Sequence, residues 1–142
     1  MFHDASACVI EDGEILFAGH AERYNNRQKN DPYLNKGLIK DALKHGLPDV
    51  IVLHESSKLK NMRRLQQFTW SSIKAAFTEP TAEEWIKKFY PELKGIPITN
   101  CKHHEAHAAA GILTAPDSFD NATIMTIDAI GEFQTSTIYK WE

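Results

Sequence analysis

Three of the seven histidines lie within five positions, in the stretch KHHEAH at 102–107. The alanine-rich segment that begins there predicts a helix. Residues four apart on a helix share one face, with Cβ atoms roughly 6 Å apart, so His103 and His107 can hold one ion between them. Asp128, at the end of an apolar run that predicts a buried strand, could add a carboxylate oxygen. Two imidazoles and one carboxylate suit Fe²⁺, Zn²⁺ or Mn²⁺ and leave coordination positions open for a substrate.

The same histidine cluster is compatible with simpler roles than metal binding. A histidine pair four residues apart also arises by chance on solvated helix faces. The metalloprotease motif H-E-x-x-H is excluded, because His104 and Glu105 would need a histidine at position 108, where the chain has Ala108. We therefore expect His104 to neighbour the ligands or to face solvent, although its spacing to His107 keeps it a lesser candidate ligand.

The N-terminus holds a second group of polar residues. His3, Asp4 and Ser6 precede a predicted β-hairpin, with strands over 5–10 and 14–19 and a turn at Glu-Asp-Gly, 11–13. The two-residue period of a strand places Asp4 and Ser6 on one side, where they could face a phosphate and its metal. Short polar residues at a strand start are more often turn formers or caps, so this feature is weak by itself.

Taken together, four stretches of the chain resemble one enzyme family, the NodU/CmcH-type carbamoyltransferases. The matching stretches are HDASA (3–7), AERY (21–24), HHEAHAA (103–109) and TIDAIGE (126–132). Their order and spacing agree with the family, and they span nearly the whole chain. The resemblance implies a ribonuclease H-like, actin-like ATPase lobe, an α/β fold related to the proteins that make threonylcarbamoyl-adenosine in transfer RNA.

The resemblance also implies roles for individual residues. His103 and His107 would be metal ligands, Asp128 a third ligand or a phosphate–metal bridge, and Fe²⁺ the first choice of metal ahead of Zn²⁺ or Mn²⁺. His3 and Asp4 would be catalytic. The ATP cofactor would be bound by one residue of the first hairpin and four of the second, namely Ser6, Gly131, Glu132, Thr135 and Thr137.

Members of that family are several times longer than this chain of 142 residues. They have a second lobe that closes over the nucleotide and a further domain that makes the carbamoyl-adenylate. We therefore interpret 1–142 as a single partial domain, the N-terminal lobe, incomplete at both ends and inactive alone.

The implied reaction moves a carbamoyl group from carbamoyl phosphate, with ATP, to a hydroxyl of a small molecule or nucleoside. Two alternatives stay open. One is a tRNA threonylcarbamoylation-type protein, and the other is a metal-binding or nucleotide-binding remnant without turnover.

Composition is typical of a globular cytoplasmic protein, with 42% hydrophobic and 25% charged residues. A net charge of −3 argues against a dominant nucleic-acid surface. No apolar run approaches the roughly 20 residues of a membrane span, so no membrane partner is expected. Cys8 and Cys101 both fall on predicted strands and are expected to be buried, reduced thiols.

The remaining segments predict a scaffold of alternating helices and strands around a mixed sheet. Apolar spacing predicts helices over 34–43, 59–77 and 80–89, the second with Leu65, Phe68, Ile73 and Phe77 in the core and Trp70 in the core or at a cleft rim. Strands are predicted over 49–54, 95–101, 122–127 and 135–142, with 49–54 buried and of the parallel type. These elements give the α/β class, with an N-terminal hairpin and flanking helices.

Overall fold

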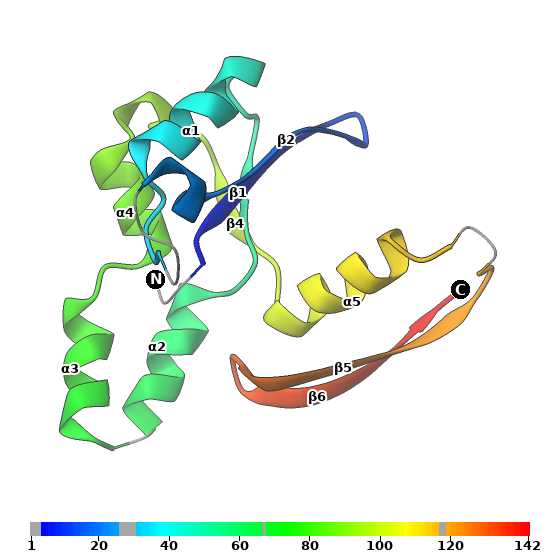
Figure 1. Cartoon of the computed structure of the whole chain (residues 1–142). Helices are drawn as coiled ribbons and strands as arrows, with labels where there is room; N and C mark the ends of the chain where they lie inside the picture. The colour runs from blue at the N-terminus through cyan, green and yellow to red at the C-terminus, as the bar shows by residue number, and fades with distance from the viewer. Residues whose placement is uncertain (1–3, 26–30, 67, 117–118) are drawn as a thin grey trace. The chain divides into compact units, whose positions relative to one another are not determined.

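The computed structural model describes residues 4–25, 31–66, 68–116 and 119–142. Helices and strands are interspersed along the chain, which confirms the α/β class (Figure 1). By its contacts the chain divides into two compact units. Unit one is Met1–Ile51 with Pro80–Pro97, and unit two is Val52–Glu79 with Ile98–Glu142. The described strands pair two by two, β1 with β2, β3 with β4 and β5 with β6, where a larger mixed sheet was predicted.

Unit one begins with the predicted hairpin of β1 (Ser6–Glu11) and β2 (Glu14–His20), which pair antiparallel. Its turn is Asp12-Gly13, with φ of 49° and 86°. Two-residue hairpin turns with positive φ at both positions favour this dipeptide, which is why the hairpin was predictable. A short 3₁₀ helix, η1 (Ala21–Tyr24), follows directly, and Ala21 is completely buried.

The hairpin packs against helix α1 (Lys36–Ala42), which continues as η2 (Leu43–His45). Asn35 caps α1, since its side-chain oxygen accepts the Leu38 N–H at 3.0 Å. Leu38 is wholly buried, and a Cβ at Gly19 would lie 2.7 Å from its Cδ1 atom. The helix predicted over 34–43 is thus confirmed, and Gly19 leaves room for the Leu38 side chain.

Unit one also contains α4 (Ala82–Phe89) and η3 (Pro91–Leu93). A capping box starts α4, because Thr81 and Glu84 each accept the other's backbone N–H. Ile86 and Tyr90 are buried, and the predicted helix over 80–89 is confirmed.

The next described strand, β3 (Ile51–Leu53), pairs with β4 (Ile98–Asn100). The backbone N–H of Cys101 donates to the Leu53 carbonyl at 2.9 Å. The expectation that 49–54 is buried is wrong, because Val50 and Val52 are 47% and 58% exposed.

The single helix predicted over 59–77 is two helices, α2 (Ser57–Gln66) and α3 (Trp70–Thr78). Phe68 has a φ of +49°, which no helix interior tolerates, and Thr69 then caps α3. Several apolar side chains around this break are exposed to solvent. Phe68 and Phe77 are 85% and 76% exposed, so their predicted place in the core is wrong, and Trp70 is exposed as well.

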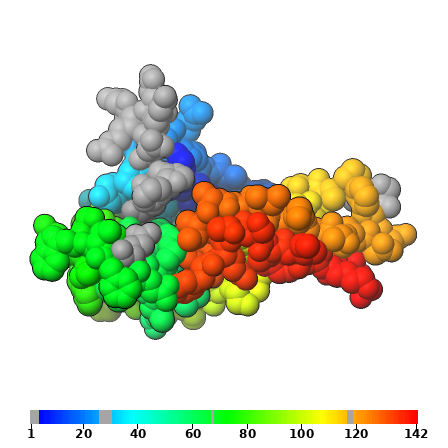
Figure 2. Space-filling view, turned by 90° about the horizontal axis from the view of Figure 1, so that it is seen from below, coloured from blue at the N-terminus to red at the C-terminus, as the bar shows by residue number. Residues whose placement is uncertain are grey.

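Unit two ends with helix α5 (His103–Leu113) packed on the long hairpin of β5 (Ala122–Gly131) and β6 (Gln134–Trp141) (Figure 1). Alternate residues of β5 lie on opposite faces. Ile124 and Thr126 are sheltered, whereas Met125 and Ile127 are exposed, and the outer face of the hairpin is the orange-to-red surface of Figure 2. The hairpin confirms the strands predicted over 122–127 and 135–142.

The register of this hairpin shifts between Ile127 and Gly131. Ile127 pairs with Ser136 and Gly131 with Gln134, so the three residues 128–130 stand opposite the single residue 135. Asp128 is the first residue of this bulge, and bulges often re-aim a side chain beside a functional site.

Two further expectations concern single features. Cys8 is exposed and Cys101 half-buried, so the buried position predicted for Cys8 is wrong: it lies on the same outer side of β1 as Ser6. Both thiols are free. Among the described helices, none combines the length and apolar character that crossing a bilayer requires.

Candidate metal centre

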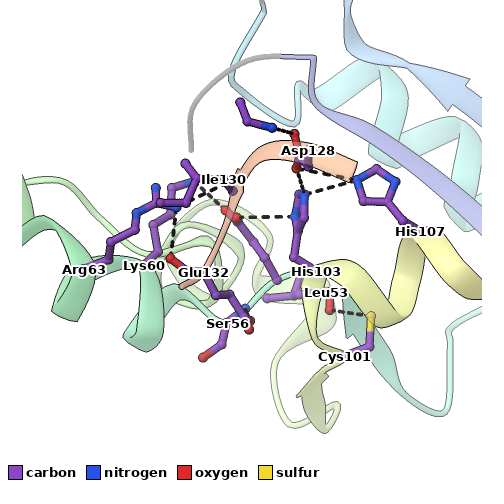
Figure 3. Close-up of polar contacts among 12 residues, drawn as sticks. Leu53, Ser56, Lys60, Arg63, Cys101, His103, His107, Asp128, Ile130 and Glu132 are labelled. Atoms are coloured by element: carbon purple, nitrogen blue, oxygen red, sulfur yellow. Dashed lines mark hydrogen bonds and ion pairs between the residues drawn. The ribbon is translucent and has the colours of Figure 1, made fainter. Parts of the chain in front are cut away.

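The three predicted metal ligands converge at the start of α5 (Figure 3). His103 and His107 are one turn apart on this helix, and Asp128 reaches them from the bulge in β5. The Nε2 atom of His103 lies 2.7 Å from Asp128 Oδ2 and 3.1 Å from His107 Nε2. The remaining separation, from His107 Nε2 to Asp128 Oδ2, is 3.9 Å. Ligand atoms around a tetrahedral ion with bonds of about 2.1 Å lie roughly 3.4 Å apart, so this triangle suits one ion.

The carboxylate of this cluster is held in its charged form. A hydrogen bond with His103 lowers the pKa of Asp128, and a second from the backbone N–H of Ala129, at 2.6 Å, lowers it further. The charged form is the one that binds a metal.

Gly131 gives the histidines the room they occupy. A Cβ built on it would lie 2.3 Å from Cδ2 of His103 and 2.7 Å from Cδ2 of His104, distances that no packed side chain tolerates. The predicted role of Gly131 was nucleotide binding. In the structure its visible role is to let the strand backbone lie directly against two imidazole rings.

His104, next to the first ligand, lies between helix α5 and the β5–β6 hairpin. Its side chain is 1% exposed, and its Nδ1 atom lies 2.9 Å from the Thr137 hydroxyl oxygen. The alternative that His104 faces solvent is therefore wrong, because one step along a helix turns it from the open side toward the hairpin. Thr137, expected to face a nucleotide, is half-buried and bonded to His104, whereas Thr135 is exposed on β6.

Glu132 ties the turn of the hairpin to helix α2. It is 5% exposed, and its Oε1 atom accepts the backbone N–H of Ser56 at 3.1 Å. Arg63 donates to the carbonyl oxygens of Glu132, at 3.2 Å, and Ile130, at 3.4 Å (Figure 3). The carboxylate predicted to face a nucleotide is thus engaged within unit two, and Glu132 carries a φ of +53° there.

Two residues at the end of β3, His54 and Glu55, were missed as site residues. Oε2 of Glu55 lies 4.0 Å from Nδ1 of His103, on the side of the ring away from Asp128, and the His54 ring lies 5.9 Å from the His103 ring. The sequence places both residues directly after an apolar strand, as it does Asp128, but no spacing rule relates them to His103.

Their electrostatics favour a charged carboxylate beside a neutral imidazole. Burial pushes the pKa of Glu55 upward, but the hydrogen bond and charge of Lys60, together with smaller effects of His54 and His103, outweigh burial, so the net pKa is lowered. Burial of its ring lowers the pKa of His54, although the residue as a whole keeps an exposed surface.

The predicted residues of the first hairpin belong to unit one. His3 lies outside the described residues. Asp4 is exposed with a φ of +53°, and Ser6 is the exposed first residue of β1.

Comparison with known proteins gives little further constraint. No family model matches the chain. The chain is similar to the uncharacterized protein sll1178 of Synechocystis sp.. The two are 24% identical over an alignment of 159 residues, which covers 97% of this chain and 26% of the relative. The chain therefore spans about a quarter of the length of this curated relative.

Proposed function

We propose that His103, His107 and Asp128 bind one divalent metal ion, and that the chain is the N-terminal lobe of a NodU/CmcH-type carbamoyltransferase with an actin-like fold. The convergence of two Nε2 atoms and one carboxylate oxygen within 3.9 Å carries the metal assignment. Fe²⁺ is the first choice, with Zn²⁺ or Mn²⁺ as alternatives, since imidazole and carboxylate ligands suit all three. The four matching sequence stretches support the family assignment.

The proposed reaction transfers a carbamoyl group, derived from carbamoyl phosphate with ATP, to a hydroxyl of a small molecule or nucleoside. The hydroxyl oxygen attacks the carbamoyl carbon of the carbamoyl-adenylate, the bond from that carbon to the phosphate oxygen breaks, and AMP leaves with the bonding electrons. The hydroxyl proton passes to a basic side chain. A bound metal ion would polarise the carbamoyl carbonyl or hold phosphate. This chain's contribution is to hold His103, His107 and Asp128 in place, with Gly131 and His104 behind them.

The ratio of lengths supports a lobe rather than a whole enzyme. The chain matches 26% of the relative, and a protein of that length has room for the second lobe and the carbamoyl-adenylate domain of the family. We propose that the acceptor pocket and part of the ATP site come from such further segments. Of the residues predicted to bind ATP in unit two, the exposed Thr135 would contribute to that site, whereas the side chains of Glu132 and Thr137 already have partners within the unit.

The metal assignment is tested by metal content and affinity. Protein purified without chelator is analysed for metals, and Zn²⁺ and Mn²⁺ are titrated calorimetrically into the wild type, His103→Ala and His107→Ala. Loss of either imidazole should weaken metal binding by at least roughly 10–100-fold. That is the effect typical of mutating a residue that hydrogen-bonds to a metal ligand, and loss of a ligand itself should cost no less. His45→Ala, an exposed histidine of unit one, is the matched control. Equal metal content in all four proteins would remove the site.

Catalysis is tested separately. With carbamoyl phosphate, ATP and a hydroxyl acceptor, the 142-residue chain should show no turnover, whereas a longer protein containing it should turn over and should lose activity with His103→Ala. Robust turnover by the short chain would contradict the lobe interpretation. Metal binding without turnover in the longer protein would favour the non-catalytic remnant.

A tRNA-directed function has less support in the structure. The basic residues of 58–64 would be a candidate for contact with RNA phosphates; they are Lys58, Lys60, Arg63 and Arg64. Three of these four side chains have partners within the protein. Lys60 pairs with Glu55, Arg64 with Glu79 at 2.8 Å, and Arg63 donates to two carbonyl oxygens of the β5–β6 turn. Binding of the protein to tRNA with a steep salt dependence would reverse this preference.

A further inference from the structure

A second group of ligand atoms lies on the opposite side of the His103 ring. The ligand atoms of His54, Glu55 and His103 all lie within 4.8 Å of one another. All three residues belong to unit two, and His54 and Glu55 directly follow β3. The group therefore has the composition of the first cluster, two imidazoles and one carboxylate, but is more widely spaced.

The two nitrogens of His103 face different surroundings. Nε2 is 2.7 Å from Asp128, whereas Nδ1 is buried and makes no hydrogen bond to any described residue. A buried ring nitrogen without a partner is costly and calls for an explanation. The nearest acidic oxygen, Oε2 of Glu55, is 4.0 Å away, which is too long for a hydrogen bond but leaves room for an ion to join the two atoms.

Glu55 is already oriented for that role. Its other oxygen, Oε1, is paired with Lys60 of helix α2, so the carboxylate can present Oε2 alone. The charge of Lys60 opposes a nearby cation, and the 4.0 Å between Oε2 of Glu55 and Nδ1 of His103 requires the ligands to move inward. Both effects predict weaker binding here than at the first cluster.

We propose that His54, Glu55 and Nδ1 of His103 form a second divalent-cation site beside the first, with His103 shared between two ions. The proposal rests on the proposed metal centre only through His103. When both ring nitrogens bind metal, the imidazole gives up its remaining proton to solvent, so uptake of the second ion releases one proton and His103 becomes a bridging ligand. No electron transfer is involved.

The test is a Zn²⁺ titration of the intact chain, followed by calorimetry and elemental analysis. The wild type should take up two equivalents, the second more weakly. His54→Ala should keep the tight equivalent and lose the weak one, and Glu55→Gln should weaken only the second. His107→Ala should weaken the tight equivalent, and His103→Ala should lose both. His45→Ala serves as the control for loss of a histidine outside the site. The circular dichroism spectrum of every variant should match that of the wild type, which shows that the variant is folded.

Each outcome decides the proposal and separates it from the first site. One equivalent in the wild type that persists in His54→Ala but weakens in His107→Ala would overturn the second site and leave the proposed metal centre intact. Two equivalents that both persist in His54→Ala would place the second ion elsewhere and overturn the proposal. Repeating the titration in buffers of different ionisation enthalpy should show proton release with the second equivalent, and its absence would exclude the shared ring.

Discussion

The two compact units bury different chemistry. Among the described residues, unit one buries mainly apolar side chains: Ala21, Leu38, Ile39, Ala42, Ile86, Tyr90 and Leu93, with Asp31 as the polar exception. In the described part of unit two the buried residues are Ala108, Gly131 and three polar ones, His104, Thr126 and Glu132. Unit one therefore relies on the burial of apolar surface, worth about 25 cal/mol per Å². Unit two relies on partners for its buried polar groups, which cost free energy wherever a partner is missing.

This difference shows what a histidine cluster requires of its surroundings. His103, His104 and His107 lie against a hairpin that offers them a carboxylate, a threonine hydroxyl and a glycine. We expect the stability of unit one to fall most when a buried apolar side chain is made smaller. We expect the stability of unit two to fall most when a side chain is added next to the histidines or a hydrogen-bond partner is removed.

The largest effect is expected from Leu38→Ala in unit one. Removing a fully buried leucine should lower the free energy of unfolding by about 2–5 kcal/mol. Amide hydrogen exchange should locate the loss in β1, β2 and α1, while Zn²⁺ affinity is unchanged. Equal loss of protection in α5 and β5 would mean that the two units do not differ in the way their buried residues indicate.

Gly131→Ala should break unit two instead. The new methyl group overlaps the His103 ring, and overpacking of this kind costs about 1–3 kcal/mol. The variant should also bind metal more weakly, because the ring can relieve the overlap only by leaving Asp128. Gly111→Ala is the matched control: it lies in helix α5, where its Cβ would come no closer than 4.0 Å to Cγ2 of Ile124. That change should stabilise the helix by roughly 0.5–1 kcal/mol, and destabilisation by both variants would contradict the clash argument.

The smallest effect is expected from pH. The pKa of Asp128 is lowered in the folded protein, chiefly by the hydrogen bond with His103, so the unfolded chain binds its proton more readily. The resulting stability is present above the ordinary value of 3.8 and is lost as the pH falls through the lower folded value. Urea unfolding of the wild type and Asp128→Asn, compared from neutral pH to below that value, should show a shallower decline in the variant. Parallel curves would mean that Asp128 gains nothing from His103.

Local patterns were sufficient for much of this fold. The Asp12-Gly13 turn, the helix capped by Thr81 and Glu84, and the alanine-rich helix all depend on neighbours within a few positions. The turn and both helices are where the sequence predicted them. The break at Phe68 was not predictable, because no glycine or proline marks it. In the candidate metal centre, the spacing of four residues was enough to predict that His103 and His107 lie on one face of a helix.

The support around that pair depends on residues far apart in sequence. The hydrogen bond between His104 and Thr137 spans 33 positions, and the approach of Gly131 to His103 follows from the packing of α5 on the hairpin. No spacing rule covers either contact. Glu55 and His54 were missed for the same reason, because their relation to His103 exists only after β3 and β4 pair.

The outer face of the β5–β6 hairpin has a practical consequence. Met125, Ile127 and Ile138 are 62%, 72% and 67% exposed on it, and in the described part of the sheet each of the two strands has one unpaired edge. Apolar side chains beside free backbone donors and acceptors are the features that promote strand addition between molecules. Preparations of the 142-residue chain should therefore associate as they are concentrated, and a charged residue at Ile127 or Ile138 should delay that association without touching the histidines.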